Sequence, residues 1–303
     1  MTARKNHLFL IILLGLLLAG CAAPQPGLPA QTAAPAALAT PQASPSPRPT
    51  QPSGPPTPVA GLSAAGIDLG SIQIDSGALP WQPVVIPAQA YSGSGGSGAV
   101  RGWPEHVAVL FGITNPAQWN PAVPFLRIYP VAEYQALMQA GGDERVGEQV
   151  ARLQELLAGP PPAALDGVMP VLPVTPRPMG RWMQYRPLDT QVGPGVRYLA
   201  DTPLRPFPGP VTNQDLGYYY QGLTADGKYY LSFYFPVSAP GLPEATQEVT
   251  RELAAKFDSI EAAGAYMAEL RQQLDSLPPS AFTPQLDLID KIVQSIKFTY
   301  STP

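Results

Sequence analysis

The stretch at residues 215–237, which reads DLGYYYQGLTADGKYYLSFYFPV, constrains the fold of this chain more than any other. Two runs rich in tyrosine and phenylalanine flank the pair Asp226-Gly227. Asp and Gly both tolerate the positive φ that a two-residue type I′ turn requires, so this pair favours a tight hairpin. A turn at this place sets Leu223 opposite Tyr230 and Tyr218 opposite Phe235. The stretch therefore predicts a long antiparallel hairpin.

Side chains alternate between the two faces of a strand, which divides the hairpin into two unlike surfaces. We expect the more apolar face in the core, and it carries Tyr218, Tyr220, Leu231, Phe233 and Phe235. The other face mixes aromatic rings with amide and hydroxyl groups, and it carries Tyr219, Gln221, Leu223, Tyr230, Ser232 and Tyr234. Two hypotheses stay open for this second face. It is a ligand-facing patch of Tyr219, Tyr230, Tyr234 and Gln221, or the C-terminal helices cover it to bury their own apolar stripes.

The rest of the folded part predicts strands first and helices later. Strands are expected at residues 67–75, 81–87, 106–113, 124–131, 181–188 and 195–200, most clearly in the β-branched and aromatic segments 106–113 and 124–131. Residues 131–140 predict a short helix. Residues 143–159 predict a longer one, because Val146, Val150 and Leu153 recur at helical spacing before Gly159-Pro160.

The last quarter of the chain is predicted to be helical. Val249, Leu253 and Phe257 form one apolar stripe, and a second stripe contains Ile260, Met267, Leu270 and Leu274. Between them Asp258 and Glu261 have the spacing of a capping box. Segregated strands and helices predict an α+β fold, with an antiparallel sheet whose central aromatic hairpin packs against the C-terminal helices. The ending LDLIDKIVQSIKF resembles the terminal helix of the Mog1/PsbP-like α+β sandwiches, over about fifteen residues.

The N-terminus has the order of segments found in a secretory signal peptide. Arg4 and Lys5 precede an aliphatic run at residues 8–18, which is shorter than the ~20 residues of a membrane-spanning helix. The run ends in Leu18-Ala19-Gly20-Cys21, which resembles the lipobox of bacterial lipoprotein precursors. The resemblance implies that a signal peptidase recognises Leu18, Ala19 and Gly20 and cuts before Cys21. It also implies a diacylglyceryl group on the Cys21 sulfur, and thus a membrane anchor.

Cys21 is the only cysteine of the chain, so neither an intramolecular disulfide nor a CxxC site can form. The alternatives to lipidation are an ordinary secreted protein with a chance cysteine and a thiol used for redox chemistry. Residues 21–65 are rich in Pro, Ala, Ser and Thr and carry one charge, Arg48, which predicts a disordered, proline-rich tether. We therefore expect a signal peptide at 1–20, a lipidated tether at 21–65 and a single domain at 66–303.

Net charge and histidine content exclude several kinds of partner and site. The formal charge is −4, and it becomes more negative when Arg4 and Lys5 leave with the signal peptide, which argues against nucleic acid as a partner. His7 also leaves, so His106 alone cannot form a histidine zinc cluster. We expect His106 at the edge of a strand with its imidazole partly solvated.

Three further motifs have simpler explanations than catalysis. GSGGSG at residues 93–98 matches G-x-G-x-x-G, but Gly102 and Pro104 disfavour the helix that must follow a dinucleotide loop, so no cofactor is expected. The pairs Asp143/Glu144 and Asp287/Asp290 could act as the two carboxylates of a glycosidase. They are explained more simply as charges that stabilise a helix N-terminus and as the solvated face of a helix. Asp226 lacks the run of oxygen ligands that calcium requires. No catalytic residue and no metal ligand is predicted.

These observations favour a lipid-anchored protein outside the cytoplasm, in the cell membrane or the outer envelope. The expected role is a non-enzymatic binding or envelope-assembly module, whose ligand is an envelope polymer or a protein. The alternative is a hydrolase of envelope polymers, which would need His106 or a carboxylate pair within reach of a substrate atom.

Overall fold

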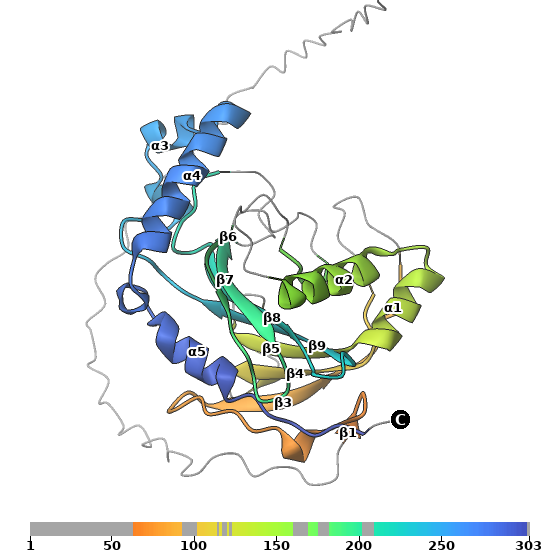
Figure 1. The fold of residues 1–303 in the computed structure, drawn as a ribbon. Helices are drawn as coiled ribbons and strands as arrows, with labels where there is room; N and C mark the ends of the chain where they lie inside the picture. Colours follow the sequence, from red (N-terminus) through yellow and green to blue (C-terminus); the bar gives the residue numbers. More distant parts are fainter. Residues whose placement is uncertain are drawn as a thin grey trace, which may run out of the picture. The chain divides into compact units, whose positions relative to one another are not determined.

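A seven-stranded antiparallel sheet forms the centre of the computed structural model (Figure 1). The structure describes residues 63–92, 102–113, 115–116, 120, 123–159, 169–174, 182–201 and 209–301. All of these belong to one unit, Ser53–Pro303. The predicted signal peptide, nearly all of the tether and the 93–98 loop lie outside the described residues.

The strands follow the order β3-β4-β5-β9-β8-β7-β6 across the sheet. Their bounds are β3 Trp81–Ile86, β4 His106–Phe111, β5 Phe125–Pro130, β6 Trp182–Pro187, β7 Gly195–Asp201, β8 Leu216–Leu223 and β9 Tyr229–Pro236. The predicted hairpin is β8 with β9, and its register is confirmed, since Leu223 pairs with Tyr230 and Tyr218 with Phe235. The antiparallel sheet, together with the helices described below, also confirms the α+β fold class.

The turn of the hairpin differs from the predicted type I′ turn. Gly227 has a positive φ of 73°, but Asp226 does not, and the Gly227 amide donates to the Thr224 carbonyl oxygen at 2.8 Å. The Asp226 carboxylate accepts hydrogen bonds from the Thr224 hydroxyl and the Lys228 amide. These side-chain bonds stabilise a wider loop without positive φ at Asp226, and the strand register stays the same.

Two glycines opposite each other leave room for a tyrosine ring on the sheet. Gly195 of β7 pairs with Gly222 of β8. A Cβ atom would lie 2.2 Å from Tyr220 Oη at Gly195 and 2.3 Å from it at Gly222. The Tyr220 ring therefore lies across both positions, and only residues without a side chain fit beneath it.

The C-terminal helices cover the face of the sheet that contains Tyr218 and Tyr220. They are α3 Arg251–Ala255, α4 Ile260–Ser276 and α5 Leu286–Gln294, with short 3-10 helices η3 Thr246–Glu248 and η4 Pro279–Ala281. Buried α4 and α5 side chains pack with this face in one apolar core: Tyr266, Leu270, Leu274, Leu286, Ile289 and Val293. The packing of the aromatic hairpin against the C-terminal helices is thus confirmed.

Two details of α4 differ from the sequence prediction. Ser259, and not Asp258, caps the helix, because its hydroxyl accepts a hydrogen bond from the Ala262 amide at 3.1 Å. Ile260, which the sequence predicts in the apolar stripe, is 94% exposed. The first buried residue of α4 is Tyr266. The apolar stripe therefore begins more than a turn later than predicted.

The edge strand β6 holds the C-terminal end of α4. Gln184 sits in an irregularity of β6 with a positive φ of 53°. Its side-chain amide donates to the carbonyl oxygens of Leu274 at 2.7 Å and Leu277 at 3.0 Å. Arg271 of α4 donates to the Trp182 carbonyl oxygen and lies over the Trp182 ring, 5.3 Å from its centre. The carbonyl oxygen of Leu277, the C-cap residue of α4, thereby gains a hydrogen-bond partner.

Two other helices cover the opposite face of the sheet, α1 Val131–Ala140 and α2 Arg145–Ala158 (Figure 1). They pack with Tyr198, Tyr219 and Tyr230 in a second core. The hypothesis that the C-terminal helices cover the Tyr219 face is therefore wrong. Both faces of the sheet are largely apolar, so each attracts a helical layer, and α1 follows β5 directly onto this side.

The beginning and the end of the described chain pair with each other. Residues 67–75, predicted as one strand, form β2 Ile67–Asp68, a 3-10 turn η1 Leu69–Ser71, and an extended segment, with β1 Ser63–Ala64 before them. Ser301 donates to the Gly66 carbonyl oxygen, Asp68 to that of Thr299, and Gln73 to that of Lys297. The two ends of the domain thus lie side by side in antiparallel pairing.

Candidate functional site

The predicted patch of Tyr219, Gln221, Tyr230 and Tyr234 lies in the second core. Tyr219 is 7% exposed, Gln221 and Tyr230 are fully buried, and Tyr234 is half-buried. The Tyr219 ring stacks on Tyr198 with 5.7 Å between ring centres and contacts Tyr234 at 5.3 Å. These rings pack on one another, so in this structure they offer no open platform to a ligand.

His106 is also buried, contrary to the expectation of a partly solvated imidazole. It opens β4, is 1% exposed, and its ring lies 4.4 Å from that of Tyr129. Its Nδ1 lies 2.9 Å from the Pro104 carbonyl oxygen. Burial lowers the pKa of His106 to about 4. The imidazole is thus neutral at neutral pH and lies out of reach of solvent, which does not suit a general base for an external substrate.

Three of the four carboxylates in the predicted pairs have structural partners. Asp143 forms an ion pair of 2.6 Å with Arg145, which lowers the pKa of its carboxyl group. Glu144 accepts a hydrogen bond from Gln139. Asp290 is buried and lies 3.4 Å from Arg197 Nε, so its assignment to a solvated face was wrong, whereas Asp287 is exposed. In the described part of the chain no group of three or more His, Cys, Asp or Glu side chains is arranged to hold a metal ion.

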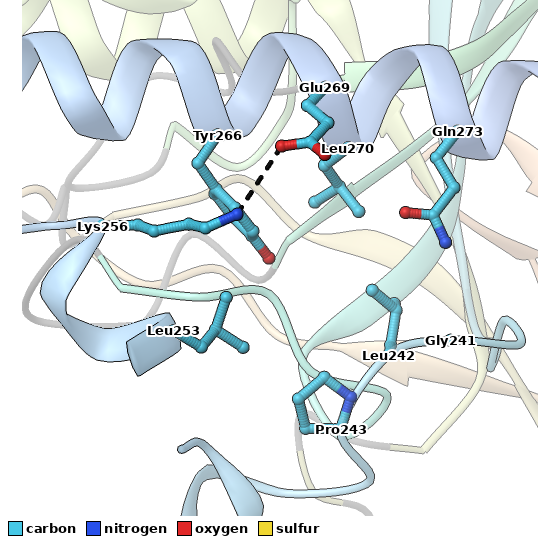
Figure 2. A pocket seen from close by; sticks show the side chains of 9 residues that line it. All are labelled: Gly241, Leu242, Pro243, Leu253, Lys256, Tyr266, Glu269, Leu270 and Gln273. Carbon is cyan, nitrogen blue, oxygen red and sulfur yellow. Dashed lines mark ion pairs between the residues drawn. The ribbon is translucent and has the colours of Figure 1, made fainter. Parts of the chain in front are cut away.

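A pocket of about 180 Å³ opens between α3, α4 and the loop that follows β9 (Figure 2). Its lining combines an apolar wall with a polar rim. The wall residues are Leu242, Pro243, Leu253, Tyr266 and Leu270, and the rim residues are Lys256, Glu269 and Gln273, with Gly241 in the loop. Figure 2 shows Lys256 directed toward Glu269 at one end of the pocket and Gln273 at the other.

Local capping builds the two helical walls of this pocket. The Thr250 hydroxyl accepts a hydrogen bond from the Leu253 amide at 3.2 Å and starts α3. Ser259 starts α4 in the same way, after Lys256 has closed α3. The short link between the caps turns the chain back, so that Leu253 and Leu270 face the same space.

The charged groups of the pocket are paired with each other but remain accessible. Lys256 Nζ lies 3.6 Å from Glu269 Oε2, and the two side chains are 43% and 74% exposed. Such an exposed pair contributes only about 0.2–1 kcal/mol to stability. Lys256 Nζ also lies 5.6 Å from the centre of the Tyr266 ring. A ligand that carries both charges can therefore replace this pairing at little cost.

Sequence reasoning missed this pocket. Leu253 and Leu270 were assigned to apolar stripes, but Lys256, Glu269 and Gln273 carried no signal, since single polar residues on helices are usually solvated. The loop at Gly241 lies far from α4 in sequence, and only the fold brings it beside Gln273.

Comparison with known proteins gives no relative on which to base a function. No family model matches the chain, and the searches of curated proteins and of solved structures return no significant match. Within the described ranges, no helix has the length and the hydropathy needed to cross a membrane.

Proposed function

We propose that this protein is a lipid-anchored, extracytoplasmic binding module that holds a short segment of a protein partner in the α3–α4 pocket. The anchor is Cys21, which the lipobox-like sequence Leu18-Ala19-Gly20-Cys21 marks for lipidation. The proline-rich residues that follow it serve as the tether. The observation that carries the binding role is the mixed lining of the pocket.

The lining suits a peptide better than a purely apolar or a purely charged ligand. Leu253 and Leu270 offer a surface for one apolar side chain of the partner. Lys256 and Glu269 offer opposite charges at the rim, and the Gln273 amide both donates and accepts hydrogen bonds. An extended peptide supplies matching groups, since its backbone carries one donor and one acceptor per residue.

An envelope glycan is the less suitable ligand for this pocket. Sugar rings commonly stack on a free aromatic face, and Tyr266 is the one aromatic residue of the lining. Lys256 lies over its ring, and Phe257 packs against it at 5.1 Å. The hydrolase alternative has less support still, because His106 is buried and both Asp143 and Asp290 are bound to arginines.

Site-specific photo-crosslinking in cells tests the binding role. A benzoylphenylalanine is placed at Gln273 in the pocket and, as a matched control, at Gln294, the exposed last residue of α5. We expect one discrete protein adduct from position 273 and none of that mass from position 294. The adduct should weaken several-fold in the Lys256→Glu variant, which places two carboxylates side by side at the rim.

Two results would overturn the proposal. The same adducts at both positions would show that contact at Gln273 is not specific to the pocket. An adduct at position 273 that resists protease but is removed by a glycan-cleaving enzyme would assign the pocket to an envelope polymer.

A further inference from the structure

Four deeply buried side chains on the Tyr219 face of the sheet carry polar atoms without a hydrogen-bond partner in the described protein. The atoms are His106 Nε2, the hydroxyl oxygens of Tyr134 and Tyr230, and both amide atoms of Gln221. All four side chains are at most 1% exposed. A buried polar atom that makes no hydrogen bond costs about 1–3 kcal/mol, so a group of five such atoms requires an explanation.

These side chains belong to one continuous region beneath α1. The His106 ring contacts Tyr129, and Tyr129 contacts Tyr134 of α1 with 5.1 Å between ring centres. Tyr129 is paired across the sheet with Tyr230. Gln221 is paired with Ser232, one position along the same face from Tyr230. The four side chains therefore belong to one face of the adjacent strands β4, β5, β9 and β8 and to α1, the helix that follows β5.

The protonation of His106 shows which kind of molecule its free nitrogen can bind. Nδ1 faces the Pro104 carbonyl oxygen, which can only accept, so Nδ1 carries the proton. Because the imidazole is neutral, Nε2 is left as an acceptor that needs a donor. Burial raises the pKa of both Tyr134 and Tyr230, so their hydroxyl groups remain protonated and able to donate.

The occupant must therefore both donate and accept. It has to donate to His106 Nε2 and to Gln221 Oε1, and it has to accept from the Gln221 amide and from a tyrosine hydroxyl. An anion cannot donate to the two acceptors. A cation would find no carboxylate among these four side chains. A neutral, amphoteric and small molecule satisfies all five atoms.

We propose that this region is an internal hydration site, in which ordered water molecules bridge Gln221, Tyr230, Tyr134 and His106. Buried waters in proteins typically make about three hydrogen bonds each to polar groups that lack protein partners. The interface between α1 and the sheet accordingly contains ordered water, although aromatic rings surround it.

The sign of a stability change tests this proposal. Tyr230→Phe in the full chain removes one hydroxyl and keeps the ring. If the hydroxyl binds water, its loss removes hydrogen bonds and the urea midpoint should fall. If the hydroxyl is dry and unpartnered, its loss relieves a buried polar group and the midpoint should stay or rise, which would overturn the proposal.

A double variant and a direct structural measurement complete the test. Tyr230→Phe and Gln221→Leu should each lower the midpoint, and the double variant should lower it by less than the sum, because both remove the same water. A crystal structure of the wild-type chain should show water oxygens within 3.2 Å of Gln221 and Tyr230. Additive effects, or density for a bound organic molecule in place of water, would contradict the assignment.

Discussion

The Tyr218 hydroxyl donates a hydrogen bond of 2.7 Å to Asp290 Oδ1, across 72 positions of sequence. It joins the central strand β8 to the buried face of α5. Arg197 of β7 lies against the same carboxylate oxygen at 3.4 Å, and Arg186 lies 3.4 Å from the other oxygen. One helical carboxylate thus connects three strands to the last helix.

Loss of the Tyr218 hydroxyl should destabilise the fold. A buried hydrogen bond to a charged group contributes about 1.5–3 kcal/mol, so Tyr218→Phe should lower the free energy of unfolding by this amount. Urea denaturation measures it. The control is Tyr300→Phe, since Tyr300 donates a similar bond to Asp226 at 3.1 Å in an exposed setting where water can replace it. Equal losses in the two variants would contradict a special role for the buried bond.

The Asp290 carboxyl group should make stability depend on pH. Burial raises the pKa of Asp290 above its ordinary value, although Arg197 and the Tyr218 hydrogen bond act in the opposite direction. The folded state therefore holds this proton more tightly than the unfolded state. The contribution of Asp290 to stability is present below the unfolded pKa of 3.8 and is lost as the pH rises through the higher folded value.

The variant Asp290→Asn isolates this effect, because its amide does not titrate. Unfolding measured between pH 3.5 and 7 should show the wild type losing stability relative to Asp290→Asn as the pH rises above about 3.8. Asp258→Asn, at an exposed position, serves as the control. Wild-type and Asp290→Asn curves that run parallel over this range would refute the prediction.

A methyl group at Gly222 should disrupt the sheet beneath Tyr220. The added Cβ would lie 2.3 Å from Tyr220 Oη, and the ring is fully buried. Gly222→Ala should therefore lower the free energy of unfolding by about 1–3 kcal/mol, as overpacked cores do. Gly264→Ala is the matched control, since no atom lies within 4 Å of its added Cβ.

The control should change stability in the opposite direction. Gly264 lies within α4, and alanine stabilises a helix interior by about 0.5–1 kcal/mol relative to glycine. Thermal or urea unfolding of both variants gives the comparison. If Gly222→Ala left the free energy of unfolding unchanged, the Tyr220 ring would have room to move, contrary to the prediction.

Under the proposed lipidation, replacement of Cys21 should release the protein from membranes. Two acyl chains anchor a protein stably, and Cys21 is the only thiol that can receive them. Cys21→Ala should move the protein from the detergent phase to the aqueous phase on phase separation. Ala23→Ser, which keeps the cysteine, should remain with the detergent. Unchanged partitioning of Cys21→Ala would refute lipidation.

The hairpin could be predicted in detail because its information is local. Alternating side chains on both sides of Asp226-Gly227 determine the register, and the register determines which residues share a face. The turn type could not be predicted, because the Asp226 carboxylate binds the Thr224 hydroxyl and the Lys228 amide, contacts that only the loop itself reveals.

The placement of the helices could not be predicted to the same degree. Apolar stripes predict that α2 and α4 bury one side, but both faces of the sheet accept such stripes. Asp290 shows the same limit, because a lone carboxylate on a helix looks solvated until Arg197 and Tyr218 are brought to it. The α3–α4 pocket likewise depends on the loop Gly241 to Pro243 lying beside Gln273, which is 30 residues further along the chain.

The pairing of the two chain ends has a mechanical consequence. Under the proposed anchoring, a pull on the tether enters the domain at Ser63, and the residues after it are hydrogen-bonded to the segment that ends in Ser301. Ser63 and Ala64 are themselves paired with Asp68 and Ile67 in the β1–β2 hairpin, so the force must open this hairpin before it reaches the bonds between residues 66–73 and 297–301. The short hairpin therefore shields the pairing of the two ends from a pull on the tether.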